Sequence, residues 1–419
     1  MALVTVLGAG GTTVSLTMTS LANAQIAQQL LDGVSQGVLG GVITAYNYNG
    51  TGPLNPPSGP SMMVLTGPGS VTIPASTGTV FDANTHHHVL IGGTAASQLV
   101  VTGNEGITYF GNTGSGTVIA GGGDNTIIIG GTAHGRDDDD DDRRRGYDSG
   151  DRDGHRWRSD HDDRDEHGDH DDHRNPTVPA VGSHLILTGG SADRIYALAG
   201  DVTIGAGGGN NTIVLGTGIA LVNTTGQDNI QAGSGAATID ASAGQANVTG
   251  DSGALTFIGG AMASTVFGGS GTVNATGGSG GGVFAGGSNG GNLLQAGTGA
   301  VTLYGAGSGD RLIGGLGADS LVAGNGHETL TGGAAADTFN IVHGGGGQDL
   351  ITDFTLGSDR LVLTGFSKNE FANDLKTAQT VAGGVSVTLS DHTVLTFANL
   401  STNDLKSINV LTSNGHSDH

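Results

Sequence analysis

Residues 305–340 read GAGSGDRLI GGLGADSLV AGNGHETLT GGAAADTFN, which is four nonapeptides in unbroken register. Each nonapeptide has an acid at its sixth position, namely Asp310, Asp319, Glu328 and Asp337. Each has an apolar residue at its eighth position, namely Leu312, Leu321, Leu330 and Phe339. Such a fixed period indicates a repeat architecture in which every unit stacks on its neighbours.

The glycine-rich first half of each nonapeptide favours a tight turn, because glycine adopts backbone conformations that other residues avoid. Carbonyl oxygens that point into such a turn, together with the acid that follows, form an oxygen cage suited to Ca²⁺, which takes about 6–8 oxygen ligands. The predicted side-chain ligands are Asp310, Asp319, Glu328, Asp337 and Asp349. The turns predicted to supply backbone carbonyls contain Gly305, Gly307, Gly309, Gly314, Gly315, Gly317, Gly332 and Gly333.

The residues after each acid predict a short strand whose middle, apolar side chain points into a narrow core. Two nonapeptides then make one flattened coil, so each turn lies above the turn eighteen residues earlier. We therefore expect an ion between vertical neighbours, with Asp310 facing Glu328 and Asp319 facing Asp337.

The unit GGLGADSLV at residues 314–322 resembles the calcium-binding nonapeptide of RTX (haemolysin-type) proteins at every defined position. The segment GQDLITDFTLGSDRLVLTGF at 347–366 is similar to the one that closes an RTX β-roll before the secretion signal. The resemblance implies a parallel β-roll, Ca²⁺ as the cofactor, and export by type I secretion machinery that recognises roughly 347–411. It does not extend to an RTX protease, lipase or toxin domain.

Composition agrees with stacked thin layers, since the 419 residues include 81 glycines and only 4% aromatic residues. The net charge of −23 disfavours nucleic acid and anionic lipid as partners and favours cations. Cysteine is absent, so a disulfide framework and a thiol nucleophile are excluded. The absence of Lys and Arg before Arg136 predicts no ordinary signal peptide, and the absence of a long apolar run predicts no membrane span.

Residues 17–38 show a helical pattern, with one apolar face formed by Leu21, Ile26, Leu30, Leu31 and Val34. We expect this helix to cap the open end of the solenoid, with a role in assembly as the alternative. Four prolines within 53–60 then predict a linker or an irregular first coil.

A nine-residue apolar period continues outside the acidic repeats. It is followed through Val64, Ile73, Ile91, Val100, Tyr109, Val118 and Ile127, and later through Ile186, Ile195, Ile204, Ile213, Val222, Ile239, Val248, Phe257 and Val266. Most of these coils carry neutral residues where the acidic repeats carry Asp. Asp193 and Asp228 are isolated acids at that phase, for which we expect structural hydrogen bonds.

The predicted fold is therefore all-β: a parallel β-roll or β-solenoid of nonapeptide half-coils, with an N-terminal helical cap and a small C-terminal β-rich cap. The predicted divisions are 1–60 (cap and Pro-rich linker), 61–133 (first solenoid part), 134–181 (flexible insertion), 182–304 (second solenoid part with little calcium binding), 305–346 (calcium-binding roll) and 347–419 (cap and secretion region). Alternation within 383–400 predicts a hairpin over the last coil.

The 134–181 tract is dense in Asp, Arg and His, and cannot bury enough apolar surface to offset its ordering entropy. Its His161, His167, His170 and His173 are suited to bind a transition metal such as Zn²⁺, Ni²⁺ or Cu²⁺. The alternative is a solvated tract of mixed charge. For the triplet 86–88, HHH, we expect an exposed turn.

No HExxH, GxSxG or P-loop motif occurs, so we predict that the protein is not an enzyme. The favoured function is a secreted, calcium-dependent structural subunit of the bacterial cell surface or extracellular matrix that self-associates. The alternatives are an adhesin that binds a surface such as cell-surface glycan, and a metal-buffering protein. Less favoured are a glycan-active enzyme and an ice-binding solenoid, for which Thr108, Thr117 and Thr126 form only a short row.

Overall fold

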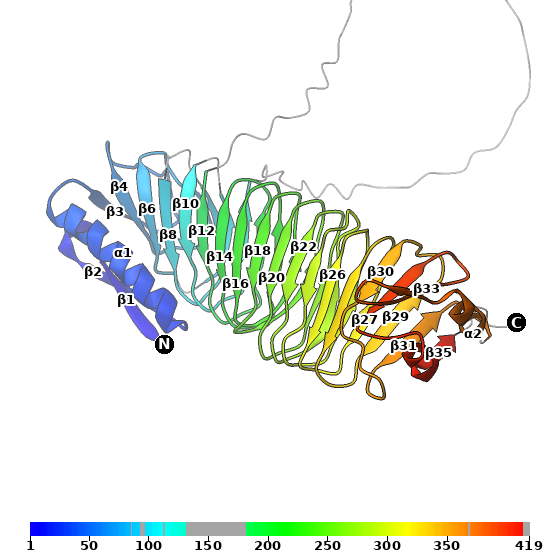
Figure 1. The fold of residues 1–419 in the computed structure, drawn as a ribbon. Helices are drawn as coiled ribbons and strands as arrows, with labels where there is room; N and C mark the ends of the chain where they lie inside the picture. Colours follow the sequence, from blue (N-terminus) through cyan, green and yellow to red (C-terminus); the bar gives the residue numbers. More distant parts are fainter. Residues whose placement is uncertain (85, 93–96, 112–113, 131–181, 368, 414–419) are drawn as a thin grey trace, which may run out of the picture.

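The computed structural model shows one elongated parallel β-solenoid with an extra layer at its N-terminal end and a small cap at its C-terminal end (Figure 1). It describes the chain except residues 85, 93–96, 112–113, 131–181, 368 and 414–419. Each complete coil contributes one strand to each of two sheets, called sheet I and sheet II below. The predicted all-β solenoid is confirmed.

Sheet I is a parallel ladder in which each strand pairs with the corresponding strand of the next coil. In order, its strands are β3 (Thr44–Tyr48), β4 (Ser61–Leu65), β6 (Thr77–Asp82), β8 (Ser97–Thr102), β10 (Ser115–Ile119), β12 (His184–Leu187), β14 (Val202–Ala206), β16 (Ala220–Thr224), β18 (Ala237–Asp240), β20 (Leu255–Ile258), β22 (Val273–Thr276), β24 (Leu293–Gln295), β26 (Arg311–Gly315), β28 (Thr329–Gly333) and β30 (Gln348–Ile351).

Sheet II is a parallel ladder of fifteen strands. In order, these are β5 (Ser70–Thr72), β7 (His88–Ile91), β9 (Ile107–Phe110), β11 (Thr126–Ile129), β13 (Arg194–Ala197), β15 (Thr212–Leu215), β17 (Gln227–Gln231), β19 (Gln245–Thr249), β21 (Ser264–Phe267), β23 (Gly282–Ala285), β25 (Val301–Tyr304), β27 (Ser320–Val322), β29 (Thr338–Val342), β31 (Arg360–Thr364) and β35 (Asn409–Ser413).

The core lies between the two sheets, where alternate residues of every strand point inward. The eighth-position residues of the acidic repeats are all fully buried there, as predicted: Leu312, Leu321, Leu330 and Phe339. The nine-residue period fails near the N-terminus. Val64 and Ile91 point outward, and the core positions are taken by Met63, Leu65 and Leu90.

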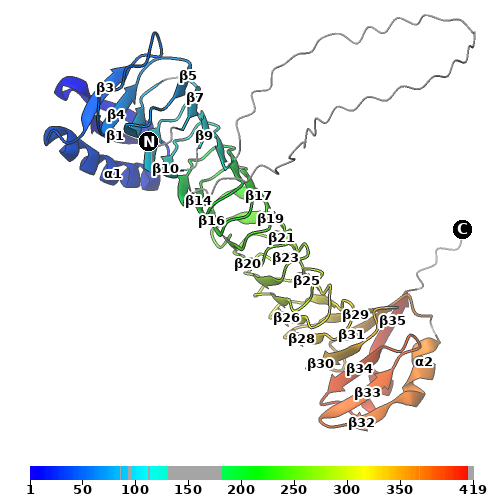
Figure 2. The same cartoon turned by 90° about the horizontal axis from the view of Figure 1, so that it is seen from above.

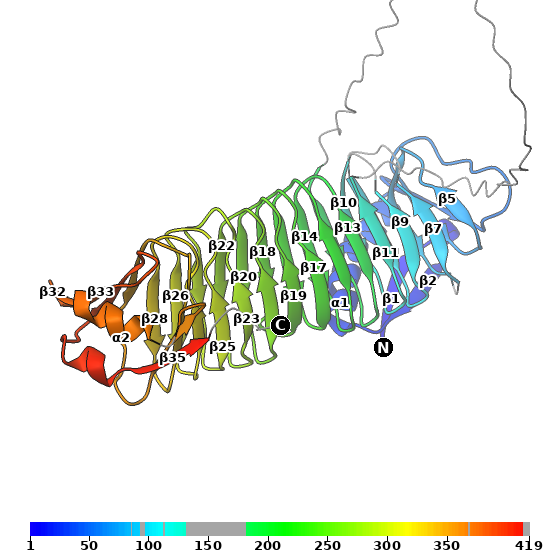
Figure 3. The same cartoon turned by 90° about the vertical axis from the view of Figure 1, so that its right-hand side faces the viewer.

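The N-terminal layer consists of an antiparallel hairpin, β1 (Ala2–Leu7) and β2 (Thr13–Met18), and helix α1 (Leu21–Leu39). It packs against the outer face of sheet I rather than across the end of the core (Figures 1 and 3). Outward side chains of sheet I, including Met62, Phe81 and Val101, are fully buried beneath it. The open end of the core is instead contacted by side chains from β3 and the Pro-rich loop after it, namely Tyr46, Tyr48 and Leu54.

The buried face of α1 agrees with the expected one only at Leu31, which is fully buried, and at Val34, which packs against the same cluster. The other buried apolar residues are Ala24 and Ala27, whose small size lets the helix approach the hairpin closely. Ile26 and Leu30 are 38% and 40% exposed. The large apolar residues of this helix thus lie partly on its solvent side.

The C-terminal cap continues both sheets (Figure 2). The predicted hairpin is present as β33 (Gly384–Thr388) and β34 (Val394–Ala398), with β32 (Gln379–Val381) antiparallel to β33. Strand β34 also pairs in parallel with β30, and β35 pairs with β31. Helix α2 (Glu370–Asp374) packs beside them, so the cap covers the last coil with both helix and strand.

Candidate calcium site

The sixth-position acids precede the strands of the last coils, and the register stacks them into two columns. The column that leads into sheet I contains Asn292, Asp310, Glu328 and Asp349. The column that leads into sheet II contains Asp319, Asp337 and Asp359. All these side chains are buried, with 1–3% exposure. The predicted vertical pairs, Asp310 with Glu328 and Asp319 with Asp337, are therefore neighbours in the stack.

One oxygen of each acid in the sheet II column joins the coils by a hydrogen bond. The amide of Val301 donates to Asp319 Oδ1 at 2.7 Å, and the amide of Asp319 donates to Asp337 Oδ1 at 2.8 Å. The amide of Asp337 donates to Asp359 Oδ1 at 2.9 Å. Each carboxylate thus accepts a hydrogen bond from an amide of the preceding coil. This contact explains why the acid recurs at a fixed position.

Three acids have buried carboxylate oxygens that accept no hydrogen bond from an amide or a hydroxyl group. These are Asp319 Oδ2, Asp337 Oδ2 and both carboxylate oxygens of Glu328, whose carboxyl lies beside that of Asp349. A buried, unpaired carboxylate oxygen is strongly unfavourable, because protein replaces the water that would solvate its charge. These oxygens are therefore positioned to meet a cation.

The raised pKa values of the acids in the two columns also favour a bound cation. Burial, reinforced by the charge of Asp337, raises the pKa of Asp319 to about 6. Burial, together with Asp349 and Asp310, raises the pKa of Glu328 to about 9. Burial likewise raises the pKa of Asp337 and of Asp349. Without a counter-charge, ionisation of these groups is therefore more costly than in water.

The glycines of the turns make room for the carboxylates and for the next coil. A Cβ on Gly314 would lie 2.7 Å from Asp319 Oδ2, and one on Gly332 would lie 2.6 Å from Asp337 Oδ2. Gly315 and Gly333 have φ values of +103° and +96°, a conformation that favours glycine. The predicted turn glycines therefore shape the space around the acids.

The arrangement fits Ca²⁺ if backbone oxygens complete the site. Among the described residues, no three acidic or His side chains come together as a metal cluster. The acids instead contribute one carboxylate per turn, and Ca²⁺ readily takes the remaining ligands from backbone carbonyls. Ligation by the five predicted acids and eight predicted glycines stays a prediction, now with unpaired oxygens at Asp319, Glu328 and Asp337 to support it.

Two further acids at the roll's closing end are satisfied by the protein itself. Asp353 accepts hydrogen bonds from the amides of Gly332 and Gly333, each at 2.8 Å. Asp359 uses its second oxygen to accept from the amide of Thr355 at 2.8 Å, which caps a turn. These carboxylates help to hold the last coils in place.

A second column of polar side chains lies earlier in the chain. For its two acids, Asp193 and Asp228, the sequence predicted only structural hydrogen bonds. The amide and side chain of Asn125 donate to Asp193 Oδ1, and those of Asn211 donate to Asp228 Oδ1. Yet Asp193 Oδ2 and Asp228 Oδ2 are buried without a partner, and burial raises the pKa of Asp228 to about 6. The expected hydrogen bonds are present, but they use only half of each carboxylate.

The predicted histidine sites have different outcomes. His161, His167, His170 and His173 lie outside the described residues. In the triplet, His86 and His87 are exposed, but the expected turn is wrong for His88, which is 1% exposed in strand β7. Its Nδ1 lies 2.7 Å from Asn84 Nδ2.

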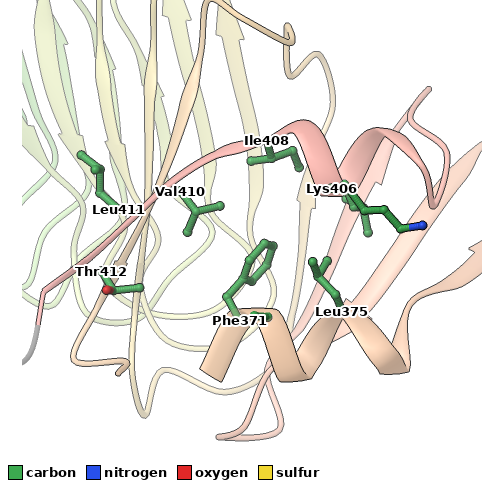
Figure 4. Close-up of a pocket in the computed structure, with 9 residues that line it drawn as sticks. Phe371, Leu375, Lys406, Ile408, Val410, Leu411 and Thr412 are labelled. Carbon is green, nitrogen blue, oxygen red and sulfur yellow. The ribbon is translucent and has the colours of Figure 1, made fainter. Parts of the chain in front are cut away.

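A hollow of about 530 Å³ lies in the C-terminal cap (Figure 4). Phe371 and Leu375 of the helical segment face Ile408 and Val410 across it. Its lining contains no carboxylate and no His side chain. It therefore offers nothing to the calcium site.

Comparison with known families agrees with this geometry. The profile of the RTX calcium-binding nonapeptide repeat matches four stretches, 187–219, 286–321, 304–339 and 322–352. The first match contains Asp193 and so lies in the part of the solenoid for which little calcium binding was expected. A search of curated proteins finds no match to the chain.

The matched repeats bind calcium and are typical of secreted proteins that use type I secretion. No helix in the described part of the chain has the length and apolar character needed to cross a bilayer. With its acid columns, its glycine turns and four matched copies, this β-solenoid contains RTX calcium-binding nonapeptide repeats within 187–219 and 286–352.

Proposed function

We propose that this protein is a secreted, calcium-dependent structural subunit of the bacterial cell surface or extracellular matrix, without enzymatic activity. The observation that supports this most directly is the set of buried, unpaired carboxylate oxygens on Asp319, Glu328 and Asp337. They lie at one end of a long shaft, next to its C-terminal cap. Calcium bound there stabilises the shaft itself.

The chemistry of this site links folding to location. Extracellular calcium modules bind at about 10⁻⁴–10⁻³ M, a concentration that the cytosol does not reach. Without calcium the stacked carboxylates repel one another, so the roll stays loose during export. Outside the cell, calcium binding becomes folding energy. The C-terminal roll then templates the coils toward the N-terminus.

The exposed side of α1 supports self-association. Ile26 and Leu30 are four residues apart and therefore share one face of the helix. Both are substantially exposed, as is Leu21 at 63%. Apolar side chains gathered on an outer layer suit a contact between subunits better than contact with water.

Electron microscopy and circular dichroism during a calcium titration from chelator test this proposal. We expect β-structure to increase with calcium and ordered polymers to form with it. The double variant Ile26→Gln/Leu30→Gln should fold on calcium and form fewer polymers. If the wild-type chain folds on calcium but its particles remain single, self-assembly is wrong and binding to a foreign surface becomes the better explanation.

A further inference from the structure

The outer face of sheet II carries a regularly spaced column of aromatic side chains. Phe110 on β9 and Tyr196 on β13 occupy equivalent positions, with one intervening strand that carries Ile128. Phe267 on β21 and Tyr304 on β25 occupy the same column, again with one strand between them. All four alternate with buried core residues and therefore point outward.

The two aromatic pairs share a single period. Gln231 on β17 lies in this column midway between Tyr196 and Phe267, two strands from each. The aromatic positions therefore fall on every second strand, with Gln231 at the one missing place. Since neighbouring strands lie about 4.8 Å apart, the period is about 9.5 Å.

Most of this face is uncharged, although the chain has a net charge of −23; Arg194 on β13 and Arg360 on β31 are charged residues that point outward on it. From β15 to β29, strands that are all described, no outward side chain of sheet II is charged. The parallel column beside the aromatics is mostly polar, with Thr212, Asn229, Asn247 and Thr265 among its members; it also contains Arg194, beside Tyr196, and the apolar Val283. Asn247 Nδ2 donates to Asn229 Oδ1 at 3.1 Å, so part of this column already forms a hydrogen-bonded ladder.

We propose that the outer face of sheet II binds an extended, neutral β-1,4-linked glycan, with Phe110, Tyr196, Phe267 and Tyr304 as its stacking platforms. The proposal deepens the extracellular function above and rests on that location. In such a glycan each sugar is turned over relative to the last, so the chemical repeat is a disaccharide. The length of that repeat in the extended chain is close to two strand spacings.

The chemistry of the two surfaces is complementary. A pyranose ring with equatorial hydroxyl groups presents C–H groups above and below its plane, and an aromatic face attracts their partial positive charge. The hydroxyl groups at the ring edge can then bond to the neutral amide and hydroxyl side chains of the adjacent column. Phe267 and Tyr304 are 50% and 40% exposed, so their rings are available for such contacts.

The test uses the full-length, calcium-loaded protein and depletion isotherms on microcrystalline cellulose and on chitin powder. We expect binding to at least one of them, and less to starch granules, whose α-linked chains are coiled. Phe267→Ala/Tyr304→Ala should lower the partition constant by about tenfold. The control Leu221→Ala/Ile258→Ala removes side chains of equal exposure, 40% each, from the outer face of sheet I, and should leave binding unchanged.

A gain-of-function pair tests the spacing itself. Gln231→Tyr restores the missing aromatic and should strengthen binding several-fold, whereas Thr249→Tyr adds the same ring one strand out of phase and should not. Equal effects of the two variants would overturn the proposed register. Absence of binding to both polysaccharides would overturn the proposal.

Sedimentation of the same variants without glycan separates this proposal from self-association. If Phe267→Ala/Tyr304→Ala instead dissociates oligomers of the chain, the face is a contact between copies and the glycan proposal is wrong. Conversely, glycan binding by particles that remain single in calcium would sustain this inference while the structural-subunit function fails. The two proposals can therefore fail independently.

Discussion

The second solenoid part, 182–304, and the calcium roll, 305–346, have the same coil geometry. They differ in the residues that occupy the start of each strand. In the second part, the residues of the sheet I column that are equivalent to Glu328 are often apolar, for example Ala237 and Val273, and they are buried without electrostatic cost. The sheet II column of this part has the isolated acids Asp193 and Asp228, whereas in the roll Glu328 in one column and Asp319 and Asp337 in the other are successive acids with oxygens left unpaired by the protein. The coil therefore does not need an acid in order to form. The acids make its stability conditional on a cation.

Removal of calcium should separate the two regions most clearly. In chelator we expect residues 305–351 to lose protection from hydrogen exchange, because their stacked carboxylates repel. Residues 237–285 should keep most of theirs. Hydrogen–deuterium exchange with mass spectrometry measures both regions in one sample. Equal loss in the two regions would show that the shaft folds as one unit and that the contrast has no local energetic basis.

Neutralisation of the acids should make the roll resemble the second part. In the triple variant Asp319→Asn/Glu328→Gln/Asp337→Asn, each amide keeps an acceptor oxygen but carries no charge. We expect a higher melting temperature in chelator and a much smaller increase on addition of calcium, measured by differential scanning calorimetry. Asp251→Asn, which removes one exposed charge, is the control and should not change the response to calcium.

The pH dependence should have opposite signs with and without calcium. Carboxyl pKa values near 4 in the unfolded chain rise in the folded roll to about 6 for Asp319 and about 9 for Glu328. Their contribution to stability is therefore greatest at low pH and is lost as the pH rises through these folded values. In chelator the melting temperature of the roll should fall between pH 5 and pH 9.

Bound calcium needs the ionised carboxylates, so in calcium the melting temperature should instead fall as the medium becomes acidic. Thermal melts across this pH range, with either calcium or chelator present, measure both slopes. Parallel slopes in the two conditions would contradict calcium binding by these acids.

We expect the smallest effect at the boundary between the two regions, where Asn292 contacts both of them. Asn292 Oδ1 accepts from the amide of Val273 at 2.8 Å, and Asn292 Nδ2 donates to Asp310 Oδ1 at 2.8 Å. Asn292→Asp loses that donor and places a second carboxylate beside Asp310. We expect a loss of about 1–3 kcal/mol in chelator, partly restored by calcium and measured by calorimetry. An unchanged stability would show that the boundary is set elsewhere.

The sequence predicted the solenoid and the acid columns because one period governs both inward apolar residues and acids. It failed where strands are buried on both faces. In β4, SMMVL is buried throughout and its last four residues are all apolar, so the inward Met63 cannot be told from the outward Val64 by pattern alone. The same ambiguity concealed the N-terminal layer, whose helix buries alanines and exposes larger residues.

Two features could be found only from the structure: the unpaired oxygens of Asp193 and Asp228, and the aromatic column. A carboxylate's second oxygen leaves no trace in sequence. The column is hidden for another reason: one coil is a residue short, since Thr212 pairs with Asn229, and a long segment separates Phe110 from Tyr196. Only the strand register shows that these rings share a line.

Strand β11 ends at Ile129 and β12 begins at His184, yet β10 pairs with β12 and β11 with β13 in unbroken register. The shaft therefore keeps its register across the 54 residues that separate these two strands in the sequence. The entropic cost of closing a chain segment grows only slowly with its length, so a long insertion is compatible with an unchanged register. For protein engineering, the position between β11 and β12 is therefore suited to the insertion of a cargo domain, displayed on a scaffold that folds on calcium.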